Sequence, residues 1–367
     1  MGSEVFLYGY GLVCISMLIY NMIYNLYSQG NNRRLERHAA KLSRRVRRQF
    51  QYLMGNQEME SSHLHFIKRK LSKITYLLAF EHFLAEEEER EEKKAYLQRL
   101  RPVFQQLAKV YSKRENTQTA YFCYFLTCHG KELDCEELRR DIVSYMARDS
   151  LYCRVHVLKA LCAFGDGKNV AEALLLMEQK QGAELHEKVI VEILLLFSGD
   201  ASGLIEELWQ NLPRFSLRVQ RALLDYIRFK SGAYSERMYA IMEDPQADKE
   251  LRFAAIRYFG KYPDPRAREA LLRFVGDLNS LKWEYTAIAA SSLARYSGED
   301  VIKVLIRAMH SANWYVRYNA SASLEAHGLS YEELLDVMNG DDRYARDMLA
   351  YRLEIRQMIE ERRLARS

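Results

Sequence analysis

The stretch WYVRYNASASLEAHG, residues 314–328, shows most clearly how this 367-residue chain folds. Val316, Ala320 and Leu324 recur every four residues, which places them on one face of an α-helix. The small side chain of Ala320 allows a neighbouring helix to approach closely, and Gly328 is suited to end the helix. The stretch therefore predicts a helix that buries one apolar face against a second helix.

The same frame recurs along the second half of the chain. Shorter helical patterns alternate with it, so each unit holds two helices, and Ala345 opens a candidate terminal unit. The chain has only 5 prolines, and no run of alternating apolar residues predicts a strand. Two helices per regular unit predict an all-α fold of the α-solenoid type, with about six or seven repeats. The frames begin at residues 153, 185, 217, 251, 285 and 316, so successive starts lie 32, 32, 34, 34 and 31 residues apart.

These units resemble HEAT repeats, including the short variety found in many bacterial proteins. The resemblance rests on a Val/Leu-Arg-x-x-Ala pattern with a terminal glycine, clearest at 153–165 and 251–328, and it covers roughly 119–355. It implies an armadillo-like helical stack whose second helices line a concave binding surface, usually without catalysis. It also implies that the arginine pairs with an acidic residue just before the second helix, as Asp149 precedes Arg154 and Asp248 precedes Arg252.

The N-terminal residues 5–27 contain no Asp, Glu, Lys or Arg. At about 1.5 Å per residue, such a helix would measure roughly 34 Å, enough to span a hydrocarbon core of about 30 Å. A cleaved signal peptide is disfavoured because no basic residue precedes the apolar run, and a buried globular helix is the remaining alternative. We therefore predict a single transmembrane anchor at 1–28.

Eight basic residues follow the apolar run. Positive charge next to a membrane span marks the cytoplasmic side, so we expect the N-terminus outside the cell and the solenoid in the cytoplasm. The basic residues are either a topology signal alone or also bind an anionic lipid surface. The predicted division is an anchor at 1–28, a basic juxtamembrane segment at 29–58, a helical cap at 59–118 and the solenoid at 119–367. The basic residues are Arg33, Arg34, Arg37, Lys41, Arg44, Arg45, Arg47 and Arg48.

The helical cap is expected to hold two helices, at 65–84 and 86–112. The acidic run at 86–94 could contact the basic stretch at 33–48, although a solvated charged face is the favoured interpretation.

Motifs for chemistry are scarce. The nearest approach to a metal site is Cys123, Cys128, His129 and Cys135, whose spacing lacks the close cysteine pairs typical of zinc sites. We interpret the six cysteines as reduced thiols and expect no metal, no cofactor and no enzymatic activity.

Aromatic residues and an arginine gather near the starts of the later second helices. Because such residues are frequent in protein interfaces, we predict partner binding there, and the alternative is packing between repeats. The predicted binding residues are Trp283, Tyr285, Trp314, Arg317 and Tyr318.

The resulting hypothesis is a membrane-tethered scaffold or regulatory adaptor for a membrane-associated protein, such as an enzyme complex that makes surface polysaccharide. The first alternative is a HEAT-like enzyme of the DNA glycosylase or chromophore lyase type, and the second is a self-associating structural membrane protein. The net charge of +5 is modest and no basic stripe is evident, so no nucleic acid is expected as a partner. No small-molecule substrate is evident either.

Overall fold

The computed structural model describes residues 2–55, 58–88, 90–179, 182, 184–276, 282–329 and 332–364. Within these ranges every regular element is a helix and none is a strand, which confirms the predicted all-α class. The chain contacts divide the protein into two units. Unit 1 comprises Met1–Leu185 and Leu196–Leu208, and unit 2 comprises His186–Leu195 and Trp209–Ser367.

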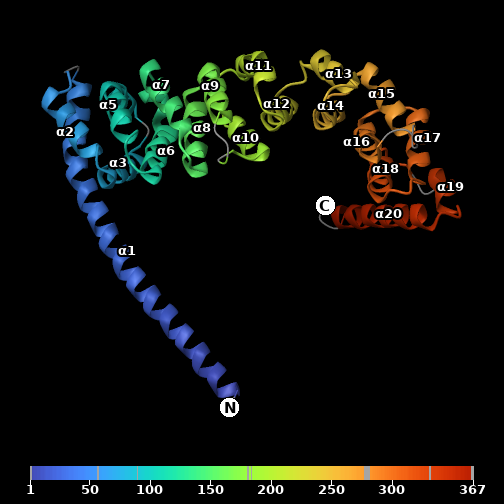
Figure 1. Cartoon of the computed structure of the whole chain (residues 1–367), viewed down its shortest axis with the longest axis horizontal. Coiled ribbons are helices and arrows are strands. Elements are labelled where there is room, and N and C mark those ends of the chain that lie inside the picture. Colours follow the sequence, from blue (N-terminus) through green and yellow to red (C-terminus); the bar gives the residue numbers. More distant parts are fainter. Residues whose placement is uncertain are drawn as a thin grey trace. The chain divides into compact units, whose positions relative to one another are not determined.

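Unit 1 is built from helices in two layers (Figure 1). One layer holds α3, α4, α6 and α8, against which α1 packs, and the other holds α2, α5, α7 and α9. The helices are α1 (Gly2–Met54), α2 (Ser61–Leu71), α3 (Ile74–Glu86), α4 (Glu91–Arg99), α5 (Arg101–Tyr111), α6 (Asn116–Leu133), α7 (Glu136–Ser144), the 3-10 helix η1 (Tyr145–Ala147), α8 (Leu151–Phe164), α9 (Gly167–Glu178) and α11 (Ala201–Gln210).

The predicted two-helix cap is four helices, α2 to α5. Lys73 has extended backbone angles, which separates α2 from α3. Pro102 has no N–H to donate to the preceding turn, so α4 ends at Arg99 and α5 begins at Arg101, with Leu100 between them. Each of the two long apolar patterns in the sequence therefore covers two helices and the break between them.

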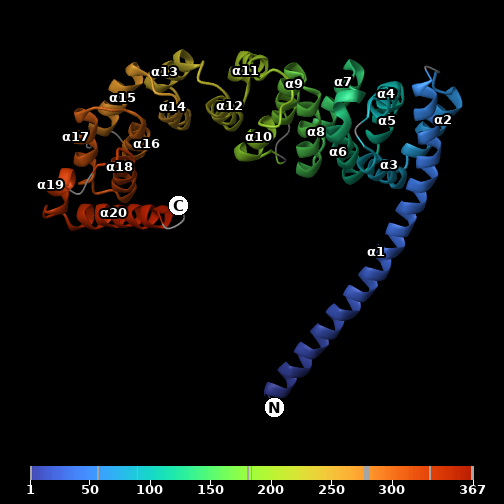
Figure 2. The same ribbon diagram turned by 180° about the vertical axis from the view of Figure 1, so that it is seen from behind.

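Unit 2 repeats a two-layer arrangement. The first-helix layer contains α13, α15 and α17, and the second-helix layer contains α10, α12, α14, α16, α18 and α20 (Figure 2). The helices are α10 (Glu187–Leu194), the 3-10 helix η2 (Leu212–Arg214), α12 (Leu217–Lys230), α13 (Ser235–Glu243), α14 (Lys249–Lys261), α15 (Pro265–Gly276), α16 (Trp283–Ser292), η3 (Leu293–Arg295), α17 (Glu299–Ala308), α18 (Trp314–Ala326), η4 (Glu332–Leu334), α19 (Leu335–Met338) and α20 (Arg343–Leu364).

The predicted repeat frame matches the second helices. Val316, Ala320 and Leu324 are all buried, as their spacing indicates. Gly165 ends α8 with a φ of 78°, a left-handed conformation that glycine adopts at little cost. The irregular frame that begins at Leu217 also has a cause, because Arg221 uses the small-residue position to reach Glu187 at 3.1 Å and Glu250 at 3.4 Å.

The arginine of the frame acts chiefly on backbone carbonyls. The Arg154 side chain is fully buried, and its Nε donates to the Arg148 carbonyl oxygen at 2.9 Å. Arg252 Nε donates to Met242 O at 3.0 Å, and Arg317 donates in the same way to Ser311 O. Each bond satisfies a carbonyl in the connection before the second helix or, for Met242, in the last turn of the first helix.

The expected pairing with an acidic residue needs correction for Arg252. The Asp248 carboxylate accepts a bond from the backbone N–H of Glu250 at 2.8 Å, so it caps α14. The Asp149 charge raises the pKa of Arg154, although burial lowers that pKa by more.

The predicted membrane anchor is wrong. Among the described residues, no helix is both long enough and apolar enough to cross a membrane. Asn21 is a polar residue among the described side chains of α1 between Tyr8 and Tyr24. The predicted single-pass topology, with the N-terminus outside and the solenoid in the cytoplasm, loses its basis. The side chains at 1–7, 9 and 25–34, which include Arg33 and Arg34, lie outside the described part.

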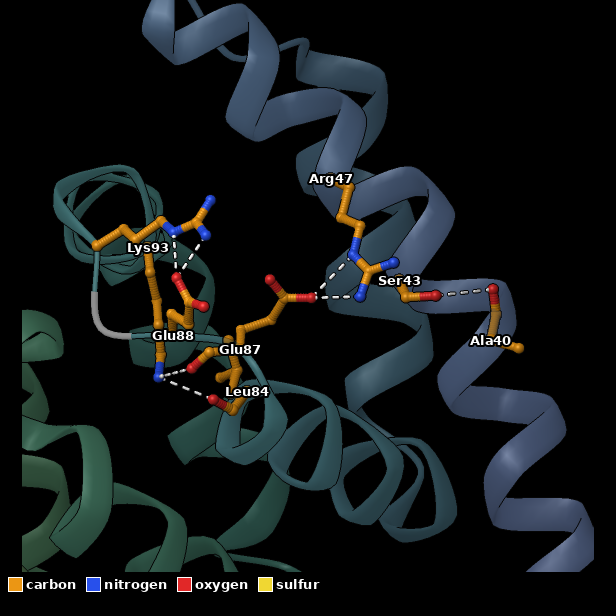
Figure 3. Close-up of polar contacts among 8 residues, drawn as sticks. Ala40, Ser43, Arg47, Leu84, Glu87, Glu88 and Lys93 are labelled. Carbon is orange, nitrogen blue, oxygen red and sulfur yellow. Dashed lines mark hydrogen bonds and ion pairs between the residues drawn. The ribbon is translucent and has the colours of Figure 1, made fainter.

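The C-terminal part of α1 instead packs on the rest of unit 1. Leu42 and Val46 are fully buried. Arg47 donates from Nε at 2.8 Å and from Nη2 at 2.6 Å to the same carboxylate oxygen of Glu87 (Figure 3). Lys93 Nζ donates to the backbone carbonyl oxygens of Leu84 at 2.8 Å and of Glu87 at 3.3 Å. The acidic run therefore does contact the basic stretch, in contrast to the favoured interpretation. Whether the remaining basic residues bind lipid stays a prediction.

Removal of the buried arginine should destabilise unit 1. We expect Arg154→Ala to lower the free energy of unfolding by about 2–4 kcal/mol, because it leaves a cavity and an unsatisfied carbonyl. Urea unfolding followed by circular dichroism measures this loss. Arg307→Ala, at an exposed position of α17, is the control and should change stability by less than about 0.5 kcal/mol. Equal stabilities of the two variants would contradict the structural role of Arg154.

Acid should weaken the packing of α2 on α4. Burial, with the Arg45 charge as the smaller cause, lowers the pKa of His63 from 6.5 to about 4, and its ring nitrogen lies 2.8 Å from the Tyr96 hydroxyl oxygen. Between pH 6.5 and about 4 the unfolded chain binds a proton at this site and the folded chain does not, so stability falls as the pH is lowered.

We therefore expect stability to fall more steeply across this pH range in the wild type than in His63→Gln. Urea titrations near pH 7 and pH 4.5 test the difference, and parallel profiles for the two proteins would refute it.

Candidate functional site

The predicted binding residues lie at the N-terminal ends of successive second helices in unit 2. Trp283 is the first residue of α16 and Trp314 is the first residue of α18. The Asn313 side chain caps α18 by accepting a bond from the Tyr315 backbone N–H at 2.9 Å. Because neighbouring second helices pack together, these first turns come close to one another.

The rings in these first turns form two stacked pairs that meet edge-on, and we call the four rings the stack. The Trp283 and Tyr315 centroids are 5.4 Å apart with planes at 19°, and those of Trp314 and Tyr318 are 4.9 Å apart with planes at 21°. Trp314 also meets Tyr315 edge-on at 5.1 Å. Their exposed fractions range from 40% for Tyr318 to 56% for Tyr315, so one side of the stack faces solvent. Exposed tryptophan and tyrosine side chains are frequent in binding sites.

Tyr285 has a different environment from the other predicted residues. Only 7% of it is exposed, and its ring lies 4.7 Å from Phe253 and 6.0 Å from Phe274. The Arg252 guanidinium lies 4.9 Å from the ring centroid. Tyr285 therefore belongs to the core between repeats, the alternative that the sequence left open.

A pocket of about 320 Å³ adjoins the stack, between α18 and α20. Trp314, Arg317 and Tyr318 line it from α18. From α20 it is lined by Tyr344, Asp347, Met348, Tyr351 and Arg352. None of the α20 residues was among the predicted binding residues, although the spacing of 344, 348 and 351 places these three on one helical face.

Both arginines of the pocket are held against aromatic rings. Arg317 lies 5.3 Å from the Tyr344 centroid, and Arg352 lies 4.3 Å from that of Tyr318. Arg352 also pairs with Glu325 at 3.6 Å. These contacts hold the rings in place before binding, so less side-chain entropy is lost when a partner binds.

The cysteine-rich segment does not form a comparable site. Cys123 is buried and Cys128 is exposed, although the two lie on the same helix, α6. Burial raises the pKa of each of these thiols, which keeps them protonated and weakly nucleophilic. Among the described residues no group of three or more His, Cys, Asp or Glu side chains is placed to hold a metal ion.

Residues 235–324 match the family model of HEAT repeats. This matched segment contains α13 to α17 and most of α18, so the resemblance inferred from the repeat frame is confirmed for this part of unit 2. HEAT repeats generally mediate interactions between proteins, which agrees with an exposed aromatic surface on the second helices. No curated protein matches the chain.

Substitutions should separate the surface aromatics from the core aromatic. Trp314→Ala should lower the free energy of unfolding by less than about 1 kcal/mol, because half of that side chain is already exposed. Tyr285→Ala should cost about 3 kcal/mol or more, because it leaves a cavity between two phenylalanines. Thermal and urea unfolding of the two variants measure this contrast. A larger loss for Trp314→Ala would show that the stack is structural.

Proposed function

We propose that this protein is an interaction scaffold and that the pocket between α18 and α20 binds a segment of a partner protein. The observation that carries the proposal is the set of exposed rings of Trp314, Tyr318, Tyr344 and Tyr351 at one pocket. The match to HEAT repeats supports the same class of function.

The lining of the pocket favours an apolar anchor residue on the partner. Rings and the Met348 side chain form most of its walls, and Asp347 adds one carboxylate at the rim. A volume of about 320 Å³ suits one large side chain with part of its neighbours. Anchors that enter such a pocket supply much of the binding energy of an interface. We therefore propose binding, without catalysis, as the activity of this site.

Site-specific photocrosslinking tests this proposal. The photoreactive residue p-benzoylphenylalanine replaces Tyr351, which is 60% exposed and lines the pocket. A crosslinked partner is identified by mass spectrometry, purified, and titrated against the full chain. We expect Trp314→Ala to weaken this binding about tenfold or more, since a buried aromatic anchor contact is lost.

The matched control is Tyr152, an aromatic residue of unit 1 that is 57% exposed. The photoreactive residue at position 152 should not capture the same partner, and Tyr152→Ala should bind it with unchanged affinity. The proposal fails if both positions crosslink equally, or if the purified partner binds Trp314→Ala as tightly as the wild type.

A further inference from the structure

A second, larger cavity lies on the second-helix layer of unit 2, apart from the aromatic pocket. Its volume is about 640 Å³, and α12, α14, α16, η3 and α18 contribute its lining. Four of the lining residues are basic and none is acidic. We call it the basic groove, and its charged residues are Arg228, Arg257, Lys261 and Arg295.

The repeat explains how these charges come together. Arg228, Lys261 and Arg295 are spaced by 33 and 34 residues, the period of the helical units. Each lies in the last turn or at the end of the second-helix segment of its repeat. Stacking of the repeats therefore turns positions that are distant in the sequence into a row of positive charge.

Helix capping accounts for one member of this row. Lys261 Nζ donates to the Arg228 and Phe229 carbonyl oxygens at 3.0 and 3.1 Å, which satisfies carbonyls at the end of α12. Arg228 pairs with Asp225 at 2.9 Å. Both residues thus have structural partners within the repeat.

Arg257 and Arg295 are not explained in this way. Arg257 lies in the middle of α14 and is half-buried, and it makes no hydrogen bond or ion pair within the described chain. Burial is the main cause that lowers the pKa of Arg257, and the nearby Asp225 charge opposes it. Arg295 is exposed at the end of η3 and likewise forms no ion pair with the described residues. A partly desolvated guanidinium without a hydrogen-bonded partner costs free energy that an anionic ligand would recover.

At the floor of the basic groove, the backbones of α14 and α16 lie close together. At Gly260 a Cβ atom would lie 3.2 Å from the Ser292 Cα, so the glycine allows α14 and α16 to approach closely. Asn319 adds an amide at the α18 end of the groove. Donors for carboxylate oxygens therefore extend beyond the guanidinium groups.

We propose that the basic groove binds an acidic segment of a partner protein, whose carboxylates pair with Arg257 and Arg295. This inference rests on the proposed scaffold function. It adds a second contact surface and states the charge of the partner segment that the surface binds. The groove is lined by no aromatic ring on which bases could stack, unlike typical single-strand nucleic-acid sites. On α15, outside the groove, Arg266 and Arg273 are paired with Glu236 and Glu243. The lining of the groove itself holds four basic residues and no acidic one, which favours an acidic partner segment.

Fluorescence anisotropy of labelled octaglutamate with the full chain provides the test. We expect saturable binding that weakens as sodium chloride rises from about 50 to 300 mM, because salt screens the charges. The double variant Arg257→Gln/Arg295→Gln should bind about tenfold more weakly or worse, since two charge-assisted contacts are lost. Arg295→Gln alone should also weaken binding, and its exposed position leaves the fold unaffected.

The matched control removes two positive charges outside the groove. Lys303→Gln/Arg307→Gln lies on α17, whose two substituted side chains are exposed, and it should bind octaglutamate as the wild type does. Trp314→Ala should also bind normally, which keeps this test separate from that of the aromatic pocket.

Three results would overturn the proposal. They are equal binding by the groove and control double variants, loss of octaglutamate binding in Trp314→Ala, and tighter binding of a labelled single-stranded oligonucleotide than of octaglutamate.

Discussion

A pair of helices cannot bury both of its apolar faces by itself, and the rest of this structure depends on that constraint. Within each unit, consecutive second helices contact one another, and small residues such as Ala320 allow the close approach. Stacking also encloses backbone carbonyls in the connections and at the ends of first helices. The buried or half-buried arginines at 154, 252 and 317 donate to those carbonyls, so the same element of the repeat supplies both packing and hydrogen-bond satisfaction.

The stacking constraint also creates the surfaces. Residues at equivalent positions of neighbouring repeats lie side by side whatever their chemistry. At the first turns of α16 and α18 those residues are aromatic, and they form the stack beside the pocket. At the ends of the same class of helix they are basic, and they line the basic groove. Two different recognition surfaces thus follow from one periodicity.

Much of the fold could be predicted from the sequence because the repeat is local and periodic. The frame at Val316 located α18, and equivalent frames located α8, α12, α14 and α16. The breaks between helices were harder to predict, since Leu100 and Lys73 interrupt helices without interrupting the apolar pattern. The membrane anchor was inferred from the uncharged run at 5–27, its length and the basic residues that follow it, but no helix among the described residues is long and apolar enough to cross a membrane. Charge patterning likewise did not predict that Arg47 contacts Glu87 across 40 residues.

The candidate site was predictable only in part, because exposure depends on neighbours. The sequence could not distinguish the exposed Trp314 from the buried Tyr285. Both are aromatic residues near the start of a second helix, and they differ in what packs over them. Nor could it show the basic groove, since its charges are more than thirty residues apart and align only once the repeats are in register.

That alignment has a consequence for how such a protein can change. Because each of Arg228, Lys261 and Arg295 belongs to a different repeat, duplication or loss of one whole repeat would lengthen or shorten the groove by one charge and leave its cross-section intact. The length of the groove is therefore a count of repeats, and the length of a bound acidic segment could follow that count without the redesign of any single contact.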